Sequence, residues 1–227
     1  MITLTKDINP VNIPCAELIK IGCLFDSYKD DNSILFWRQN ENDALISFTD
    51  GNMIIYNQNA DIEELKEFID VISPCCIFSD LNTLKAIDKI PDEEIFVYGI
   101  KAENFSDIKG DELSSKELYS LLDVDGLSLP EYPYFAVDYC RRLNLGFAKY
   151  FGISGKCAAI SFNTGNFSIM NGIASHEKGY GSIALKAILS KNEGNDFLVC
   201  CREMVKPFYE KNGFKFLYKA GYWVKNK

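Results

Sequence analysis

The segment Gly179-Tyr180-Gly181 is the first part of this sequence whose residue types suit a chemical role. It lies between an apolar stretch that ends at Ala174 and a helical stretch that begins at Ser182. Glycine lets a ligand approach the backbone closely, and the first N–H groups of a helix have no partner within that helix. Together with the helix dipole, these groups favour phosphate oxygens, and Lys178 adds a cation. An ordinary turn is the competing interpretation.

The glycine loop does not match two common nucleotide-binding motifs. It lacks the third glycine of the dinucleotide fingerprint, and no Gly-Lys-Ser/Thr follows it as in a Walker loop. The stretches before it also predict an antiparallel meander rather than a βαβ unit.

A second candidate segment, Lys206 to Phe214, follows about thirty residues later and carries a tyrosine, Tyr209. A phenol is a weak acid that can donate a proton, so Tyr209 is a candidate general acid. A purely structural interpretation is also open: the segment would be one amphipathic helical turn with aromatic anchors, ended by Gly213.

Taken together and in this order, the two segments resemble the motifs of the GCN5-related N-acetyltransferase (GNAT) family. The matching residues are His176-Glu177-Lys178-Gly179-Tyr180-Gly181, the apolar strand Phe197–Cys201, and Phe208-Tyr209-Glu210-Lys211-Asn212-Gly213-Phe214. The resemblance extends from Tyr132 to Val224. Two positions depart from the family pattern: His176 replaces a Gln or Arg, and Arg202 replaces a frequent Asn.

The resemblance implies transfer of an acetyl or acyl group from acetyl-CoA to a primary amine, by direct attack in a ternary complex and without a metal. The pyrophosphate would lie on the N–H groups of Gly179 to Ser182, and an N–H near Ile173 or Ala174 would polarise the thioester carbonyl. Tyr209 would protonate the departing thiolate. The residues expected to bind the cofactor are Ile173, Ala174, Ser175, Lys178, Gly179, Tyr180, Gly181, Ser182, Arg202 and Phe208.

No motif identifies the general base. Asp138 is the candidate we select, while Glu131, His176 and a chain of water molecules remain open. Arg141 and Arg142 follow a segment similar to the one that opens the catalytic half of two-module bacterial GNAT proteins. One of these arginines would then face the acceptor, or it would form a surface salt bridge.

Two other functions remain compatible with the sequence. A non-catalytic acyl-CoA-binding module or sensor is favoured by the replacement at His176 and disfavoured by the retention of Tyr209. A structural or partner-binding protein that has lost the ligand is the third possibility. The acceptor is either a small molecule or a peptide amine.

Several elements must position these residues in the second half of the chain. Turn residues separate the β-prone stretches, and the second, third and fourth of the strands below are expected to form an antiparallel meander. The predicted strands are Tyr134–Tyr139, Leu145–Ile153, Lys156–Phe162, Phe167–Ala174, Phe197–Cys201 and Phe216–Val224, and the predicted helices are Ser182–Ser190 and Lys206–Asn212.

The first half shows a clear hairpin signal, Asp50-Gly51, between the β-prone stretches Ala44–Thr49 and Asn52–Asn57. Asp61 is placed to cap a helix with an apolar face, and Ser114-x-x-Glu117 predicts a capped helix that ends near Leu122. Further expected elements are a helix over residues 15–25 and strands Ser33–Arg38, Cys75–Phe78 and Glu94–Ile100.

The predicted fold class is α+β, in three layers, with a mixed and mostly antiparallel sheet. The stretch Asp123–Pro130 reads as a linker, so we expect an N-terminal module over 1–126 and a GNAT acyl-CoA-binding domain over 131–227. The first module is either a degenerate copy of the same fold or an unrelated substrate-gating or dimerisation module.

Composition restricts the class of protein. The 227 residues have a net charge of −8, acidic residues dominate up to residue 130, and basic residues dominate after it. This balance argues against general nucleic-acid binding, and no apolar run is long enough to cross a membrane. Eight cysteines without Cys-x-x-Cys spacing, beside a single histidine, favour buried thiols over disulfides or zinc. We therefore expect a soluble cytoplasmic protein, and a homodimer remains open.

Overall fold

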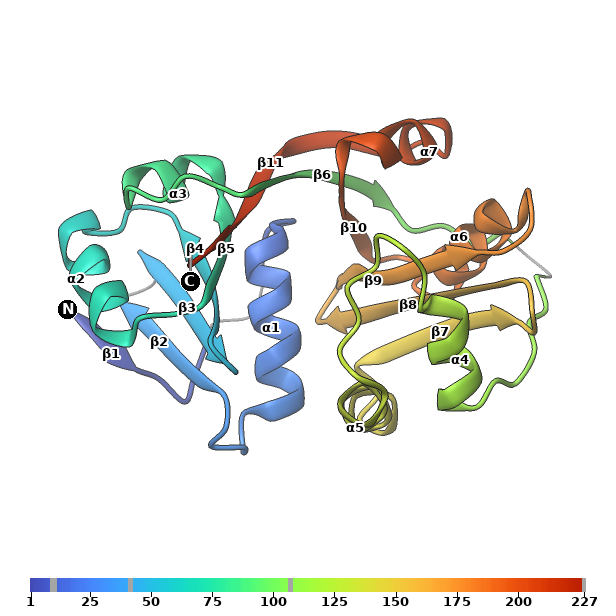
Figure 1. The fold of residues 1–227 in the computed structure, drawn as a ribbon, viewed down its shortest axis with the longest axis horizontal. Helices are drawn as coiled ribbons and strands as arrows, with labels where there is room; N and C mark the ends of the chain where they lie inside the picture. The colour runs from blue at the N-terminus through green and yellow to red at the C-terminus, as the bar shows by residue number, and fades with distance from the viewer. Residues whose placement is uncertain (9–11, 41–42, 106–107, 226–227) are drawn as a thin grey trace. The chain divides into compact units, whose positions relative to one another are not determined.

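A computed structural model of the chain describes residues 1–8, 12–40, 43–105 and 108–225 (Figure 1). The chain forms two compact units: unit 1 contains Met1–Tyr98 and Cys200–Lys227, and unit 2 contains Gly99–Val199. The chain passes from one unit to the other within strands β6 (Glu93–Lys101) and β10 (Asp196–Cys201). This division differs from the sequence segments 1–126 and 131–227, which stay a prediction about the chain's modules.

Unit 1 is built around a sheet in which β1, β2, β3, β4, β5, β11 and β6 are neighbours in that order. Only β4 and β5 pair in parallel among the pairs that we describe there. Its elements are β1 (Ile2–Leu4), α1 (Ala16–Tyr28), β2 (Leu35–Gln39), β3 (Ala44–Thr49), β4 (Asn52–Asn57), α2 (Ile62–Ile72), β5 (Cys76–Asp80), α3 (Leu81–Ala86), most of β6, the short 3₁₀ helix η1 (Glu203–Val205), α7 (Lys206–Lys211) and β11 (Lys215–Val224).

Local signals placed the β3–β4 hairpin and helix α2 correctly. Asp50 and Gly51 both have positive φ, 49° and 77°, as the tight turn requires, and the strands begin and end where predicted. Asp61 caps α2 by accepting a hydrogen bond from the Glu64 backbone N–H. The short elements β1 and α3 carry no sequence signal that predicted them.

Unit 2 contains an antiparallel meander with helices on both of its faces. Alternate residues of β8 face opposite sides: Ile160 packs in a cluster with α4 and α5, while Ser161 hydrogen-bonds Asn192 at the end of α6. The elements are the end of β6, α4 (Ser115–Leu122), α5 (Tyr132–Asn144), β7 (Ala148–Ile153), β8 (Cys157–Thr164), β9 (Phe167–Ser175), α6 (Tyr180–Lys191) and the start of β10.

The predicted strand Tyr134–Tyr139 is wrong, because this segment lies within helix α5. Its aromatic and β-branched residues suggested a strand, yet Phe135, Tyr139 and Arg142 are buried at helical spacing. Pro133 stands in the first turn, where the missing N–H breaks no helical hydrogen bond.

The same order of elements occurs twice along the chain. The first repeat runs α1, β2, β3, β4, α2, β5, α3, β6, and the second runs α5, β7, β8, β9, α6, β10, α7, β11. The last strand of the second repeat, β11, pairs antiparallel with β5 of the first repeat (Figure 1). This repetition gives the two-module α+β architecture that the sequence predicts.

None of the helices in the described ranges is both long enough and apolar enough to span a lipid bilayer. All eight cysteines carry free thiols; Cys23, Cys157 and Cys201 are buried, and Cys75 and Cys140 are exposed.

A buried carboxylate connects β11 to helix α1 in unit 1. The Tyr218 hydroxyl donates a hydrogen bond to Glu17 Oε2 at 2.5 Å and accepts one from the Ala16 N–H at 2.8 Å. The Cys15 thiol donates to the same Glu17 oxygen, and Glu17 Oε1 has no partner in the structure. Glu17 is 1% exposed, and this burial raises the pKa of its carboxyl.

The raised pKa of Glu17 predicts a specific pH dependence of stability. The folded state binds this proton more tightly than the unfolded chain, so stability falls as the pH rises from 4.5 through the folded pKa. We expect Glu17→Gln to remove this loss and to raise the free energy of unfolding at pH 7 by on the order of 1 kcal/mol. The gain should shrink toward pH 4.5.

Urea denaturation between pH 4.5 and pH 8 measures the difference in the free energy of unfolding between wild type and Glu17→Gln. The lower limit is the ordinary pKa of a glutamate carboxyl, 4.5. Glu67→Gln, on the exposed side of α2, is the matched control and should leave the pH profile unchanged. A Glu17→Gln profile parallel to that of the wild type would contradict the assignment.

Candidate functional site

Strands β9 and β10 pair in parallel over only three residues of each strand. Phe167, Ser168 and Ile169 lie opposite Asp196, Phe197 and Leu198. Strand β9 then continues to Ser175, and among the described strands only β8 pairs with this part of it. Because backbone N–H and C=O groups require partners, this edge of β9 can accept an extended ligand as another strand would.

A β-bulge interrupts the same part of β9. Ile160 of β8 lies opposite Gly172 and Ser161 lies opposite Met170, so Asn171 has no residue opposite it. A bulge bends the strand and re-aims neighbouring groups, and bulges are frequent beside active sites. The predicted cofactor residues Ile173, Ala174 and Ser175 follow directly after this bulge.

We call residues Ser175–Ser182, which connect β9 to the first turn of α6, the α6 loop. Gly179 is the N-cap of α6 with φ of 91°, and no side chain caps the helix. A Cβ atom built at Gly179 meets no atom within 4 Å, so the backbone is open there. The helix begins two residues earlier than predicted, which places Tyr180, Gly181 and Ser182 in its first turn.

One of the four backbone N–H groups expected to bind the pyrophosphate, those of residues 179–182, already makes a weak hydrogen bond. The Tyr180 N–H donates to the Glu177 carbonyl at 3.3 Å, a long hydrogen bond. The first turn contains no acidic residue, so nothing within the helix start itself repels an anion.

Lys156 adds a second cation to the α6 loop that sequence reasoning missed. Its Nζ donates to the Tyr180 hydroxyl at 2.8 Å and lies 3.8 Å from Glu177 Oε2. The hydrogen bond with Tyr180 and the charge of Glu177 raise the pKa of the Lys156 ammonium. The predicted strands pair antiparallel, so residue 156 lies opposite residue 176. This pairing is the signal from which the position of Lys156 beside the α6 loop could have been predicted.

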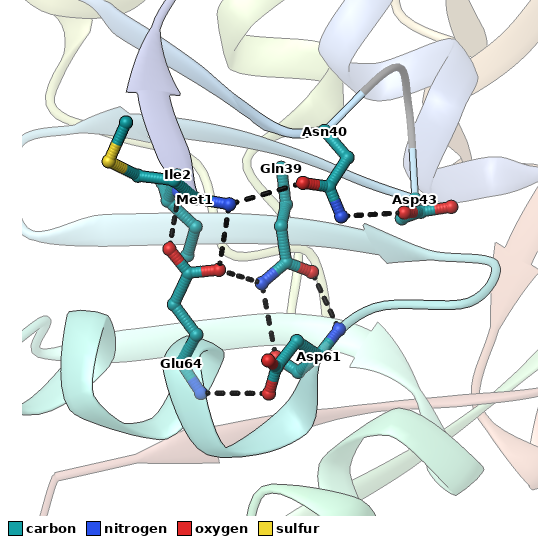
Figure 2. Close-up of polar contacts among 7 residues, drawn as sticks. All are labelled: Met1, Ile2, Gln39, Asn40, Asp43, Asp61 and Glu64. Atoms are coloured by element: carbon teal, nitrogen blue, oxygen red, sulfur yellow. Dashed lines mark hydrogen bonds and ion pairs between the residues drawn. The ribbon is translucent and has the colours of Figure 1, made fainter.

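The equivalent helix of the first repeat, α2, has a closed N-terminus (Figure 2). Asp61 caps it, and Glu63 and Glu64 stand in its first turn. The buried Gln39 accepts from the Asp61 N–H at 2.7 Å and donates to Glu64 Oε2 at 2.6 Å. Side chains therefore occupy in α2 the helix end that α6 leaves open.

His176 does not point its ring at a free helix end. Its Nε2 lies 3.0 Å from the Leu121 carbonyl oxygen, so that nitrogen carries the proton and donates. The His176 backbone N–H donates to the Lys156 carbonyl at 2.7 Å.

Asp138 and Arg142 form an ion pair on α5, with Arg142 Nε 2.7 Å from Asp138 Oδ1. Arg142 is buried and its guanidinium lies 4.3 Å from the centre of the Phe162 ring. Arg142 thus forms a salt bridge, as in one of the two alternatives, but its own side chain is buried rather than at the surface. Glu131 is the N-cap residue of α5 and is exposed.

Tyr209 lies in α7 of unit 1 and is 4% exposed. Its ring packs between Phe208 and Phe214, with centroids 5.1 and 5.4 Å away. Burial, and then the neighbouring thiols of Cys201 and Cys200, raise its pKa well above the ordinary range of a phenol. A phenol is protonated at neutral pH in any case, and the raised pKa makes this hydroxyl a weaker acid.

Neighbouring contacts fix helix α7 within unit 1. The Tyr98 hydroxyl donates to Glu210 Oε1 at 2.6 Å, directly after Tyr209 in the sequence. Arg202 pairs with Glu93, so its charge is partly neutralised.

Burial raises the pKa of the Cys201 thiol to about 12 and that of Cys200 to about 11, which makes both poor nucleophiles.

The structure thus gathers most predicted cofactor residues in one segment of unit 2. Ile173, Ala174 and Ser175 end β9, Lys178 and Gly179 lie in the α6 loop, and Tyr180, Gly181 and Ser182 start α6. Arg202, Phe208 and Tyr209 belong to unit 1, while Asp138 belongs to unit 2. The roles of all these residues remain predictions.

No protein-family model matches the chain, and no curated protein is significantly similar to it in sequence. Solved structures do resemble its fold. A proposed acetyltransferase from Pyrococcus horikoshii superposes with a TM-score of 0.57 at 9% identity, covering 90% of this chain and 78% of that one.

A tandem GNAT protein from the clavulanic acid biosynthesis pathway has a TM-score of 0.53 at 9% identity, covering 95% of this chain and 89% of its own. A conserved protein of unknown function from Staphylococcus epidermidis has a TM-score of 0.51 at 11% identity, over 77% and 84% of the two chains. The chain therefore has the GNAT fold, in a two-module arrangement consistent with that of the tandem protein. Identities this low show the fold alone.

The closed end of α2 generates a stability prediction. We expect Asp61→Ala to lower the free energy of unfolding by about 1 kcal/mol, the usual cost of losing an N-cap side chain. Urea denaturation measures it, and Asp70→Ala, exposed on the same helix, is the matched control. Equal stability of the two variants would show that the Asp61 cap contributes nothing.

Proposed function

We propose that this protein transfers an acyl group from coenzyme A to a primary amine. The observation that carries the proposal is the contrast between the two repeats: helix α6 has an uncapped start at Gly179, while Asp61 closes α2. An anion-binding helix end beside an unpaired strand edge is the arrangement that acyl-CoA requires, and the GNAT fold supports the same interpretation.

The residues of the α6 loop fit the pyrophosphate of this co-substrate. The N–H groups of Gly181 and Ser182 take no side-chain cap, and Gly179 leaves open space for close approach. Lys178 and Lys156 supply positive charge, and Glu177 opposes it. The unpaired edge of β9, from Met170 to Ser175, would hold the pantetheine amides as a neighbouring strand does.

The proposed reaction needs three groups from the chain: a backbone N–H that stabilises negative charge, a general acid and a general base. The thioester supplies an activated acyl group; a bond forms between the amine nitrogen and the acyl carbon, and the carbon–sulfur bond breaks. A backbone N–H near Ile173 or Ala174 would stabilise negative charge on the acyl oxygen. Tyr209, which like any phenol is protonated at neutral pH, would give its proton to the departing thiolate.

The amine must also lose a proton before or during the attack. Asp138 is the proposed acceptor of this proton, either directly or through water. Its pairing with Arg142 holds the carboxylate in place on the inner side of α5.

One observation favours the alternative of a non-catalytic acyl-CoA sensor. The ring nitrogen of His176 is bonded to the Leu121 carbonyl, so this side chain is not available where the family pattern has a phosphate-binding Gln or Arg. A thiol-release assay with acetyl-CoA and a panel of amines separates the two functions. Calorimetric binding of coenzyme A without any release of thiol would favour the sensor.

Replacement of Tyr209 tests the proposed acid. We expect Tyr209→Phe to lower turnover by about 10²- to 10⁴-fold, the usual worth of general acid catalysis, while coenzyme A affinity stays within about twofold. Steady-state thiol release and calorimetry measure the two quantities. Unchanged turnover would remove Tyr209 from the mechanism, and a lost thermal transition would mark a folding defect instead.

Replacement of Gly179 tests the proposed anion site. A valine there would place a side chain over the open helix end and strain a φ of 91°, so we expect coenzyme A binding to be lost. Gly194→Val is the matched control, because Gly194 has a φ of 84° and an equally open surrounding. If both variants lose affinity to the same extent, backbone strain rather than the site is responsible.

A further inference from the structure

Helix α7, which carries Tyr209, is too short to be stable by itself. It has six residues, and no side chain caps its N-terminus. An isolated helix of this length does not form in water, because nucleation costs more free energy than a few hydrogen bonds return. Other elements must therefore fix the place of α7.

Two contacts with α7 come from strand β6, the last strand of the first repeat. The Tyr98 hydroxyl donates to Glu210 Oε1 at 2.6 Å, and Lys206 Nζ lies 4.3 Å from the centre of the Phe96 ring. Phe96 and Tyr98 share one face of β6, about 6.6 Å apart along the strand. Lys206 and Glu210 share one face of α7, about 6 Å apart along the helix. Because the two spacings match, β6 contacts α7 at both ends of the helix.

The bond between Tyr98 and Glu210 is the more specific of the two contacts. A distance of 2.6 Å is typical of a hydroxyl that donates to a carboxylate, which is a strong hydrogen bond. Tyr98 is 1% exposed, and the Phe216 ring packs edge-on against it at 5.7 Å. Phenylalanine at position 98 would thus keep the packed ring and remove only the bond to α7.

The position of the Tyr209 hydroxyl depends on how α7 is held. Tyr209 directly precedes Glu210, so any shift or rotation of the helix moves both side chains. Within the described ranges, ring packing contacts the Tyr209 side chain, and no hydrogen bond holds its hydroxyl. The helix itself therefore sets where this oxygen lies.

The chain on either side of α7 is also attached to the first repeat. Arg202, before α7, pairs with Glu93, and Tyr218, after α7, donates a hydrogen bond to Glu17. The division into units agrees with these contacts, because residues 200–227 belong with residues 1–98. The first repeat thus contacts the chain before, within and after the helix that carries Tyr209.

We propose that the first repeat supports the helix of the proposed general acid, and that Tyr98 is a positioning residue that holds Tyr209 in place through Glu210. The effect on proton transfer rests on the proposed function. The fixing of α7 by Tyr98 does not.

Hydrogen exchange of the full chain, without any substrate, tests the fixing of α7. The N–H groups of Asn212, Gly213 and Phe214 donate to carbonyls of Tyr209 and Glu210. We expect Tyr98→Phe to speed exchange at these three amides about tenfold and to leave the amides of α6 unchanged, because one hydrogen bond to a charged group is lost locally.

Tyr56→Phe is the matched control for hydrogen exchange. Tyr56 also belongs to the first repeat, but its hydroxyl bonds the exposed Gln58 at 3.4 Å, far weaker than the bond of Tyr98. Exchange at the end of α7 should stay at the wild-type rate in this variant.

Thiol release from acetyl-CoA tests the positioning of Tyr209. We expect Tyr98→Phe to lower turnover by about 10- to 100-fold, because a displaced acid transfers its proton poorly, while coenzyme A affinity stays within about twofold. Glu210→Ala should match this loss. Glu210→Gln keeps an acceptor oxygen for Tyr98 and should restore turnover to within about threefold of wild type.

A double-mutant cycle separates positioning from a general loss of stability. If Tyr98 acts through Tyr209, Tyr98→Phe should cause no further loss of turnover in a Tyr209→Phe background. A variant that merely weakens the fold would lower turnover equally in both backgrounds.

Four results would overturn the proposal: unchanged exchange at α7 in Tyr98→Phe, equal acceleration in α6 and α7, wild-type turnover despite faster exchange at α7, or equal losses in the two backgrounds. The two proposals fail separately. Faster exchange at α7 alone, in a protein that releases no thiol with any amine, would refute the transferase function and leave the support of α7 by Tyr98 established.

Discussion

The early end of pairing between the parallel strands β9 and β10 is the constraint on which the rest of the structure depends. After Ile169 and Leu198, one edge of β9 has backbone groups without a partner strand, and such groups need hydrogen bonds. The bulge at Asn171 and the uncapped helix α6 follow along the same strand. The opening, the bulge and the helix end thus form one continuous stretch of backbone.

The first repeat meets the same constraint with its own side chains. Strands β4 and β5 also pair in parallel over three residues of each, but the Ser79 hydroxyl then donates to the Ile55 carbonyl at 2.7 Å. Asp61 caps the helix that follows, and Glu64 brings negative charge into its first turn. An anion at this helix end would therefore meet acidic side chains.

The sequence predicted best where local chemistry decides the structure. Gly213, with φ of 87°, ends α7 as expected, and Asp50-Gly51 turns the hairpin. Helix α5 was missed because Tyr134 and Val137, both 70% exposed, gave it the composition of a strand. The bond between Tyr218 and Glu17 joins residues 201 positions apart, and no local pattern indicates which distant strand will cover a buried carboxylate.

Four buried side-chain atoms in the described part of the chain have no hydrogen-bond partner: Glu17 Oε1, Ser47 Oγ, Tyr139 Oη and Asn163 Oδ1. Glu17 has one oxygen that accepts from Tyr218 and Cys15, so the carboxyl already links α1 to β11 and only its second oxygen lacks a partner. The hydroxyls of Tyr139 and Ser47 have no partner at all among the described residues, and both are closed off from solvent. Packing explains a partly bonded group such as Glu17. A wholly unbonded hydroxyl costs free energy, so the same fold would be more stable with phenylalanine than with tyrosine at position 139.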